Sequence, residues 1–99
     1  MAKYFLTNKA VEDLAKIWEY SYEVWSENQA DKYYGMLIDS CKEISGHPGI
    51  GKNYDEINHG LLGLKTGRHI IFYRVIKPGE IEVLRILHER MDLKNRLQE

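Results

Sequence analysis

The chain has 99 residues, of which 43% are hydrophobic and 29% charged, and its formal net charge is −1 at pH 7. This length predicts one domain, residues 1–99, and the single cysteine, Cys41, excludes an internal disulfide and a multi-cysteine metal site. No apolar run is long enough to span a bilayer and no signal-peptide pattern opens the chain, so we expect a cytoplasmic protein without membrane attachment.

The charge is unevenly distributed along the chain. Residues 1–60 carry six lysines and ten acidic residues, a net charge of −4, whereas residues 61–99 carry eight basic and five acidic residues, a net charge of +3. Dedicated nucleic-acid-binding domains are usually basic overall. The balance disfavours sequence-specific nucleic-acid binding by this chain alone, although the mildly positive C-terminal part leaves contact with nucleic acid open.

The first part of the chain predicts a strand followed by a helix. Residues 3–7 are rich in β-forming side chains, and Thr7 or Asn8 can cap a helix after them. Apolar residues then recur at helical spacing in two neighbouring stripes, which gives this helix a wide apolar surface. The stripes are Val11, Leu14, Ala15, Trp18, Tyr22 and Trp25, and Ile17, Tyr20 and Val24.

A second helix is predicted to begin after Ser26. The segment Ser26-Glu-Asn-Gln29 has the form of a capping box, and Gly46 and Pro48 end the helix. Because the junction is short, the two helices should form an antiparallel hairpin. Its apolar face is Ala30, Tyr33, Leu37, Cys41 and Ile44. The aromatic residues expected in the core are Trp18, Tyr22, Trp25 and Tyr33, while those off the main stripes, Tyr20 and Tyr34, could contact a partner.

The second half predicts a loop, three strands and a polar tail. Residues 47–60 are punctuated by glycine and proline and form the loop. The predicted strands are 61–65, 68–76 and 80–88. The tail has only Leu93 and Leu97 as anchors of a short helix. The whole chain therefore predicts an α+β fold, in which an N-terminal strand and a two-helix antiparallel hairpin pack on a small, mostly antiparallel β-sheet.

The last two strands are apolar at nearly every position, whereas a hairpin with one solvated face alternates. We expect a three-residue loop with a bulge at Gly79, because a two-residue type I or II loop splays the strands; a two-residue loop would regroup the faces. The face expected against the helices is His69, Ile71, Tyr73, Val75, Ile81, Val83, Arg85 and Leu87. The opposite face is an apolar patch of Ile70, Phe72, Leu84 and Ile86, framed by Arg68, Arg74, Glu82 and His88. Such a rimmed patch is typical of an interaction site.

Several polar residues have structural interpretations. Arg85 should pair with a carboxylate from the first helix or the loop, and His69 should be a strand-end residue satisfied by a hydrogen bond. Asp55 and Glu56 form an exposed acidic loop, and Cys41 is a buried thiol. The four histidines lack metal-ligand spacing, so we expect no metal and no cofactor.

Several segments together carry a family pattern. They are residues 28–33 (Asn-Gln-Ala-Asp-Lys-Tyr), 47–51 (His-Pro-Gly-Ile-Gly), 54–58 (Tyr-Asp-Glu-Ile-Asn), 67–73 (Gly-Arg-His-Ile-Ile-Phe-Tyr) and 83–92 (Val-Leu-Arg-Ile-Leu-His-Glu-Arg-Met-Asp). In this order and spacing they resemble the ParE toxins of the ParE/RelE toxin–antitoxin superfamily. The resemblance implies two N-terminal helices on a mostly antiparallel sheet, a cognate antitoxin that is ParD-like or of another class, and a role in plasmid stabilisation. It also implies that DNA gyrase is the target, poisoned by binding without enzymatic chemistry.

Two contact regions follow from this pattern and the resemblance. The expected antitoxin-binding residues are Ile70, Phe72, Arg74, Leu84 and Ile86. The expected target-binding residues lie in the loosely held tail and are Arg90, Met91, Leu93, Lys94 and Arg96. The alternative for the tail is a frayed helix that only shields the edge of the sheet.

A ribonuclease is the second hypothesis, because the chain also resembles the RelE and YoeB branch, which cuts messenger RNA on the ribosome. Such chemistry needs an acid, a base and cations for the phosphate, for which Arg68, Arg74 and His88 are the candidates. The YoeB-like pattern has a basic residue just after the histidine that opens this strand, where this chain has Ile70. This departure and the net charge favour a toxin without catalytic residues. A third hypothesis is a degenerate toxin that only binds its antitoxin and helps to repress its operon.

Overall fold

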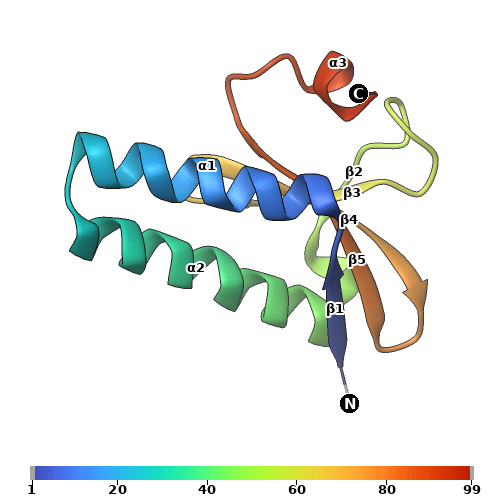
Figure 1. Cartoon of the computed structure of the whole chain (residues 1–99). Coiled ribbons are helices and arrows are strands. Elements are labelled where there is room, and N and C mark those ends of the chain that lie inside the picture. Colours follow the sequence, from blue (N-terminus) through green and yellow to red (C-terminus); the bar gives the residue numbers. More distant parts are fainter. Residues whose placement is uncertain (1, 99) are drawn as a thin grey trace.

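The computed structural model describes residues 2–98, in which a helical hairpin covers one face of a five-stranded sheet (Figure 1). The elements are β1 (Lys3–Leu6), α1 (Asn8–Val24), α2 (Glu27–Gly46), the 3-10 turn η1 (Pro48–Ile50), β2 (Lys52–Asn53), β3 (Leu62–Thr66), β4 (His69–Lys77), β5 (Glu80–His88) and α3 (Leu93–Leu97). The strand order is β1-β5-β4-β3-β2, with β1 parallel to β5 and the other pairs antiparallel. The predicted α+β fold is confirmed.

Both long helices begin at the caps that the sequence predicts. The side chain of Thr7 accepts a hydrogen bond from the backbone N–H of Ala10 at 3.1 Å, and that of Ser26 accepts one from Gln29 at 3.1 Å. These bonds satisfy donors that a helix N-terminus leaves without partners. The two caps fix where each helix starts, and the helices run antiparallel across the sheet (Figure 1).

The main core lies between the helical hairpin and the sheet. Its buried members are Ala10, Leu14, Leu37, Cys41, Ile44, Ile71, Tyr73, Ile81, Val83 and Ile86. The predicted inward face of α2 is confirmed for its aliphatic positions and for Cys41. Burial raises the pKa of the Cys41 thiol to about 11. A thiol in this environment stays protonated at neutral pH and acts as a small apolar side chain.

The inward side of α1 differs from the predicted stripes. Its buried residues are Ala10, Asp13, Leu14 and Ser21. Val11 and Tyr22 are each 51% exposed and Trp25 is 60% exposed, so their predicted places in the core are wrong. Two apolar stripes run side by side on this helix, and spacing alone does not decide which one faces inward. The rotation is fixed by Asp13, a polar residue whose carboxylate binds Arg85 on the sheet.

The register of the β4–β5 hairpin corrects the predicted faces. The turn has two residues, Pro78 and Gly79, and Gly79 has φ of 83°, which glycine adopts without a steric penalty. The predicted three-residue loop is therefore wrong, but a register shift between Val75 and Lys77 still pairs Val75 with Ile81 and keeps these residues on one face, as predicted. A second shift, between Phe72 and Tyr73, then pairs Phe72 with Arg85 and Ile71 with Ile86. An extra residue in β5 reverses the alternation beyond the shift. Ile86 therefore faces the helices and Leu87 faces the opposite side, the reverse of the prediction.

The outer face of the sheet carries a second core, so the predicted open patch is wrong. Ile70 is 7% exposed, Phe72 is 0% exposed and Ile86, in the main core, is 2% exposed. The buried members of this second core are Leu61, Ile70, Phe72 and Leu87, and the side chains that partly cover it are Tyr54, Ile57, Leu84, Leu93 and Leu97. Residues from the loop before β3 and from α3 thus supply the cover that the strand pattern requires.

The loop that covers the second core is held by its own hydrogen bonds. The Asp55 carboxylate accepts bonds from the backbone N–H of Gly60 at 2.8 Å and from the side chain of Asn53 at 3.2 Å. These bonds stabilise the charged form and lower the pKa of Asp55. The Tyr54 ring lies edge-on against Phe72, with centroids 5.2 Å apart. The loop is therefore an ordered lid on the sheet.

Candidate interaction groove

A groove of about 940 Å³ lies between the helical hairpin, the turn from β3 to β4, and the segment after β5. It is lined by Asp13, Lys16, Ile17, Tyr20, Ser21, Trp25, Tyr33, Met36, Gly67, Arg68, His69, Arg85, Ile86, Leu87, His88, Met91 and Arg96. Tyr20 is 64% exposed and Trp25 is 60% exposed. Large aromatic side chains exposed on a groove with basic residues suit binding to another macromolecule.

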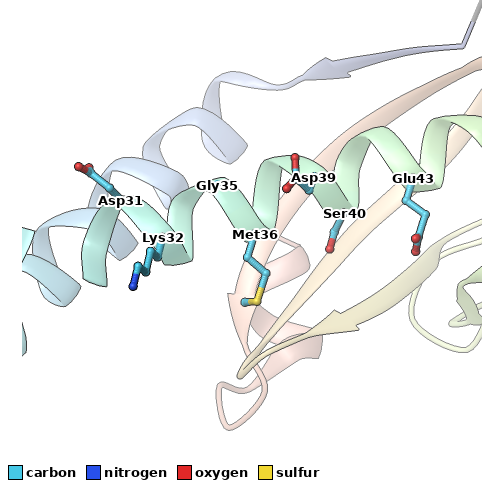
Figure 2. Close-up of a pocket in the computed structure, with 7 residues that line it drawn as sticks. All are labelled: Asp31, Lys32, Gly35, Met36, Asp39, Ser40 and Glu43. Atoms are coloured by element: carbon cyan, nitrogen blue, oxygen red, sulfur yellow. The ribbon is translucent and has the colours of Figure 1, made fainter. Parts of the chain in front are cut away.

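A smaller hollow of about 430 Å³ lies on α2. Figure 2 shows its lining side chains projecting from that single helix. They are Asp31, Lys32, Gly35, Met36, Asp39, Ser40 and Glu43. The acidic side chains in this set give the hollow a negative charge, and no second element closes it. The larger groove is the stronger candidate because it gathers residues from both helices, the sheet and the tail.

The floor of the groove contains a fixed pair of histidines. The Tyr33 hydroxyl accepts a hydrogen bond from the backbone N–H of Arg68 at 3.0 Å and lies 2.6 Å from Nδ1 of His69. The roles in this second bond depend on the tautomer of His69: with the His69 proton on Nε2, Nδ1 accepts from the Tyr33 hydroxyl. Nδ1 of His88 accepts from the backbone N–H of Arg90 at 3.1 Å, which assigns the same tautomer there. The two imidazole rings are 5.3 Å apart and nearly perpendicular.

His69 is neutral at physiological pH. Burial disfavours its charged form, and with repulsion from His88 it lowers the pKa of His69 from 6.5 to about 4. A neutral imidazole offers a hydrogen bond to an incoming group but no positive charge. The predicted structural role of His69, satisfied by a hydrogen bond, is confirmed.

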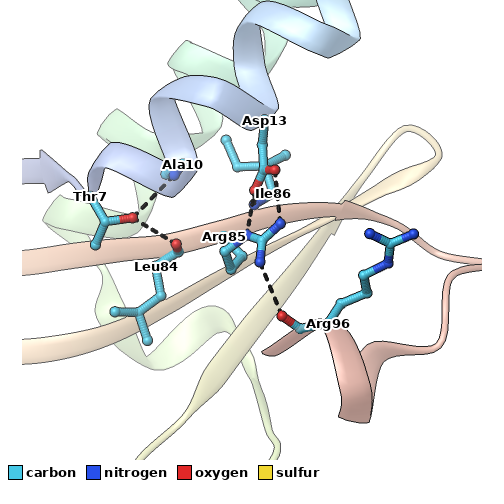
Figure 3. A network of polar contacts seen from close by, with 7 residues as sticks. All are labelled: Thr7, Ala10, Asp13, Leu84, Arg85, Ile86 and Arg96. Atoms are coloured by element: carbon cyan, nitrogen blue, oxygen red, sulfur yellow. Dashed lines mark hydrogen bonds and ion pairs between the residues drawn. The ribbon is translucent and has the colours of Figure 1, made fainter. Parts of the chain in front are cut away.

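The predicted pairing of Arg85 with a helical carboxylate is also confirmed (Figure 3). Nε of Arg85 donates to Oδ2 of Asp13 at 2.8 Å, and Nη2 donates to Oδ1 at 3.0 Å. The third guanidinium nitrogen, Nη1, donates to the backbone carbonyl of Arg96 at 3.0 Å. The side chains of Asp13 and Arg85 are 10% and 14% exposed. This arginine is committed to internal contacts and is not available as a cation for a bound phosphate.

The residues named for a ribonuclease do not all come together. Arg68 and His88 line the groove, whereas Arg74 does not and is 3.6 Å from Glu82 in an exposed ion pair near the tip of the hairpin. The predicted catalytic set is therefore not assembled. Sequence reasoning missed the contact of Tyr33 with His69, because 36 residues separate the two and no local pattern links them.

The predicted contact residues divide in the same way. Of the tail residues, Met91 and Arg96 line the groove, Arg90 and Lys94 are exposed, and Leu93 packs on the second core. Of the predicted antitoxin contacts, Ile70, Phe72 and Ile86 are buried by the chain itself. Leu84 is half-buried and Arg74 is exposed.

Two general findings concern the part of the chain that the structure describes, residues 2–98. No group of three or more histidine, cysteine, aspartate or glutamate side chains there is placed to hold a metal ion. None of the helices there combines the length and the hydropathy needed to cross a membrane.

The fold is shared with toxin chains of known structure. The chain matches one from the chromosomal ParDE system of P. aeruginosa with a TM-score of 0.75 and 23% identity, covering 89% of this chain and 96% of that one. It matches one from the RelBE2 toxin–antitoxin complex of Mycobacterium tuberculosis with a TM-score of 0.67 and 18% identity, covering 89% and 98%. The architecture is therefore the ParE/RelE-like fold.

Sequence comparison narrows this class to one family. Residues 4–93 match the family described as the ParE toxin of the type II toxin–antitoxin system parDE. The chain is 38% identical to Toxin ParE1 of M. tuberculosis H37Rv over 96 residues, 97% of this chain and 98% of the relative. It is 34% identical to Toxin ParE1 of Caulobacter vibrioides over 97 residues, 98% and 99% of the two chains. The chain belongs to the ParE family of toxins from type II toxin–antitoxin systems.

Proposed function

We propose that this toxin inhibits DNA gyrase by direct binding and that a cognate antitoxin neutralises it. The observation that carries the proposal is the match to the ParE family over residues 4–93. The groove supports binding over chemistry, because Arg85 is paired internally and Arg74 lies elsewhere. Gyrase acts on chromosomal DNA, so the proposed site of action is the cytoplasm.

The experiment for this proposal is a gyrase supercoiling assay with purified toxin. The expected result is loss of supercoiling with accumulation of cleaved DNA, both reversed by an equimolar amount of the antitoxin encoded beside the toxin. Topoisomerase I relaxation of the same plasmid is the control and should be unaffected. Supercoiling that continues unchanged at a large excess of folded toxin would reject gyrase as the target.

The groove is the better place for the antitoxin contact than the outer sheet face, which the chain already covers. Exposed Trp25 and Tyr20 give the groove apolar surface, and the exposed cations Lys16 and Arg68 lie beside them. An antitoxin segment with apolar side chains flanked by carboxylates would complement this surface.

Two variants test the groove against the rest of α1. Trp25→Ala and Arg68→Glu should each weaken antitoxin binding by at least about tenfold, because interface anchors and charge reversals commonly cost more than 1 kcal/mol. Tyr22→Ala is the matched control, since Tyr22 is an exposed aromatic residue of the same helix that does not line the groove. Titration calorimetry measures the affinities. Equal affinities for all three variants and the original chain would place the antitoxin elsewhere.

Ribosome-dependent RNA cleavage remains the second candidate because Arg68 and His88 share the groove. In that reaction His88 would transfer a proton and Arg68 would contact the phosphate. His88→Ala separates the two functions. We expect the variant to inhibit growth as strongly as the original toxin; loss of toxicity together with loss of cuts in translated messages would establish the nuclease.

A further inference from the structure

We infer that Asp13 is a positioning residue for the C-terminal segment 89–98 and acts on it through Arg85. The inference rests on the proposed function in so far as this segment contacts the target. The structural part of the inference concerns only whether α3 stays docked on the sheet. It can therefore be tested without gyrase.

Arg85 joins three elements that are far apart in the sequence. Two of its nitrogens are held by the carboxylate of Asp13 on α1, and the third holds the carbonyl of Arg96 in α3 (Figure 3). A planar guanidinium has its donors in a fixed fork, so orienting one edge orients the other. Asp13 thereby aims Nη1 at the C-terminal end of α3.

The bulge in β5 puts Arg85 in this place. Phe72 pairs with Arg85 and Tyr73 with Val83, so Leu84 is the extra residue in the strand. The carbonyl of Leu84 accepts a hydrogen bond from the Thr7 hydroxyl at 2.7 Å. The N–H of the residue after Arg85, Ile86, donates to Oδ2 of Asp13 at 3.0 Å. The start of α1 therefore satisfies the polar groups that the bulge frees, and it fixes the direction of the arginine side chain.

Other attachments of the segment lie at its start, where Lys65 Nζ is 2.9 Å from a carboxylate oxygen of Glu89 and the Glu89 N–H donates to the carbonyl of Arg68 at 2.9 Å. The helix α3 is five residues long, which is too short to be stable without tertiary contacts. Its apolar anchors, Leu93 and Leu97, are only partly buried on the second core. The contact from Arg85 lies at the far end of this helix and closes the tail against the sheet. Its loss should leave α3 attached mainly through the partly buried Leu93 and Leu97.

Docking of the tail shapes two surfaces at once. Met91 and Arg96 form part of the wall of the groove. Leu93 and Leu97 pack against the second core, which contains Phe72. A released tail would remove that wall and uncover apolar surface on the sheet. The ion pair between Asp13 on α1 and Arg85 on β5 thus controls whether the tail stays docked as a wall of the groove.

Limited trypsin digestion of the full chain tests this coupling, because Arg90, Lys94 and Arg96 are cleavage sites within the segment. In Asp13→Asn and in Arg85→Lys, cleavage in the tail should become about tenfold faster, the effect of losing roughly one charged hydrogen bond. Cleavage within residues 2–88, followed by mass spectrometry, is the internal reference and should change much less. A change in overall stability would accelerate both.

Matched variants complete the experiment. Glu12→Gln is the control, since Glu12 is an exposed carboxylate of the same helix, and it should leave tail cleavage unchanged. Asp13→Glu restores a carboxylate and should recover part of the protection. Leu97→Asp, which undocks the tail without altering the ion pair, gives the rate of the released state. If Asp13→Asn fails to fold by circular dichroism, Arg85→Lys decides, because lysine still pairs with Asp13 but cannot also reach Arg96.

The outcomes separate the inference from the proposed function. Tail cleavage at the original rate in folded Arg85→Lys would overturn the inference. Faster cleavage with a proportionate loss of gyrase inhibition supports both the coupling and the role of the tail. Faster cleavage with undiminished gyrase inhibition supports the docking role of Asp13 and overturns the part of the inference that links a docked tail to gyrase. If the original toxin does not inhibit gyrase at all, the proposed function fails, while the cleavage rates still decide whether Asp13 docks the tail.

Discussion

Burial keeps His69 in its neutral form in the groove, where its Nδ1 lies 2.6 Å from the Tyr33 hydroxyl. The folded chain holds the pKa of His69 at about 4, against 6.5 for an ordinary histidine. Between these values the unfolded chain binds a proton that the folded chain does not. The contribution of His69 to folding stability is therefore fully present above pH 6.5 and is lost as the pH falls towards 4. Acidification should therefore destabilise the protein through this one residue.

This pH dependence is tested by urea unfolding at pH 7 and pH 5. The original chain should lose more stability between the two values than His69→Asn, which cannot take up the proton. His47→Asn removes an exposed histidine and should behave like the original chain. Equal losses for the original chain and His69→Asn would show that His69 titrates normally in the folded protein.

Gly51 is required by a close contact with Tyr73. The Tyr73 hydroxyl donates to the carbonyl of Pro48 at 2.6 Å and accepts from the N–H of Gly51 at 3.0 Å. A β-carbon at Gly51 would overlap the Tyr73 ring and hydroxyl, whereas one at Gly49 would meet nothing within 4 Å. Gly51→Ala should therefore cost about 1–3 kcal/mol of unfolding free energy. Gly49→Ala should be close to neutral, and equal stabilities for the two variants would contradict the geometry.

At the scale of elements, the two faces of β4 are both core, and this changes what substitutions on it report. Phe72 is fully buried in the second core, which Tyr54, Ile57 and the leucines of α3 partly cover. Phe72→Ala should destabilise the chain by about 3–5 kcal/mol, the usual cost of emptying a large aromatic site. Denaturant titration measures this loss. A loss below 1 kcal/mol would mean that the loop and α3 do not cover the outer face in solution.

The elements themselves were largely predictable because their signals are local. The caps at Thr7 and Ser26, the apolar face of α2 and the shared face of Tyr73 and Val83 all follow from patterns within short segments. The bulge at Leu84 did not follow, because it is stabilised by Thr7, 77 residues away in the sequence. That one insertion moved Ile86 into the main core and changed the face on which a patch had been expected.

The candidate site was predictable only in part, for the same reason. Arg85 was identified as structural because an arginine on an inward face needs a carboxylate, and Asp13 supplies it. The cover over the outer face was missed because Tyr54, Ile57 and the tail leucines lie in segments without strong periodicity. The groove was missed because it forms between elements, where Tyr33, Trp25 and His88 meet only in the folded chain.

At the scale of the whole molecule, the sheet is enclosed on one side by the helical hairpin and on the other by the loop before β3 and α3 (Figure 1). We therefore propose that the interaction surface is the groove at the junction of these layers, beside the tail. Arg90 and Lys94 are exposed there and do not pack on either core. They can be changed without loss of the fold, unlike Leu93.

The role of the tail in target binding is tested at this scale by removing two of its positive charges while leaving its packing unchanged. The double variant Arg90→Ala/Lys94→Ala should keep the unfolding free energy of the original chain within about 0.5 kcal/mol, as is usual for surface substitutions. If the tail contacts gyrase, inhibition by this variant should weaken by several-fold. Undiminished inhibition would limit the tail to covering the sheet.

We propose that this ParE family member acts on gyrase by binding and not by cutting RNA. The most direct measurement compares the original toxin and His88→Ala in a gyrase supercoiling assay and in a translation-coupled RNA cleavage assay, using the same protein preparations. We expect both proteins to inhibit supercoiling with accumulation of cleaved DNA, and neither to cut translated messages. RNA cuts made by the original toxin and abolished by His88→Ala, with gyrase unaffected, would contradict this proposal.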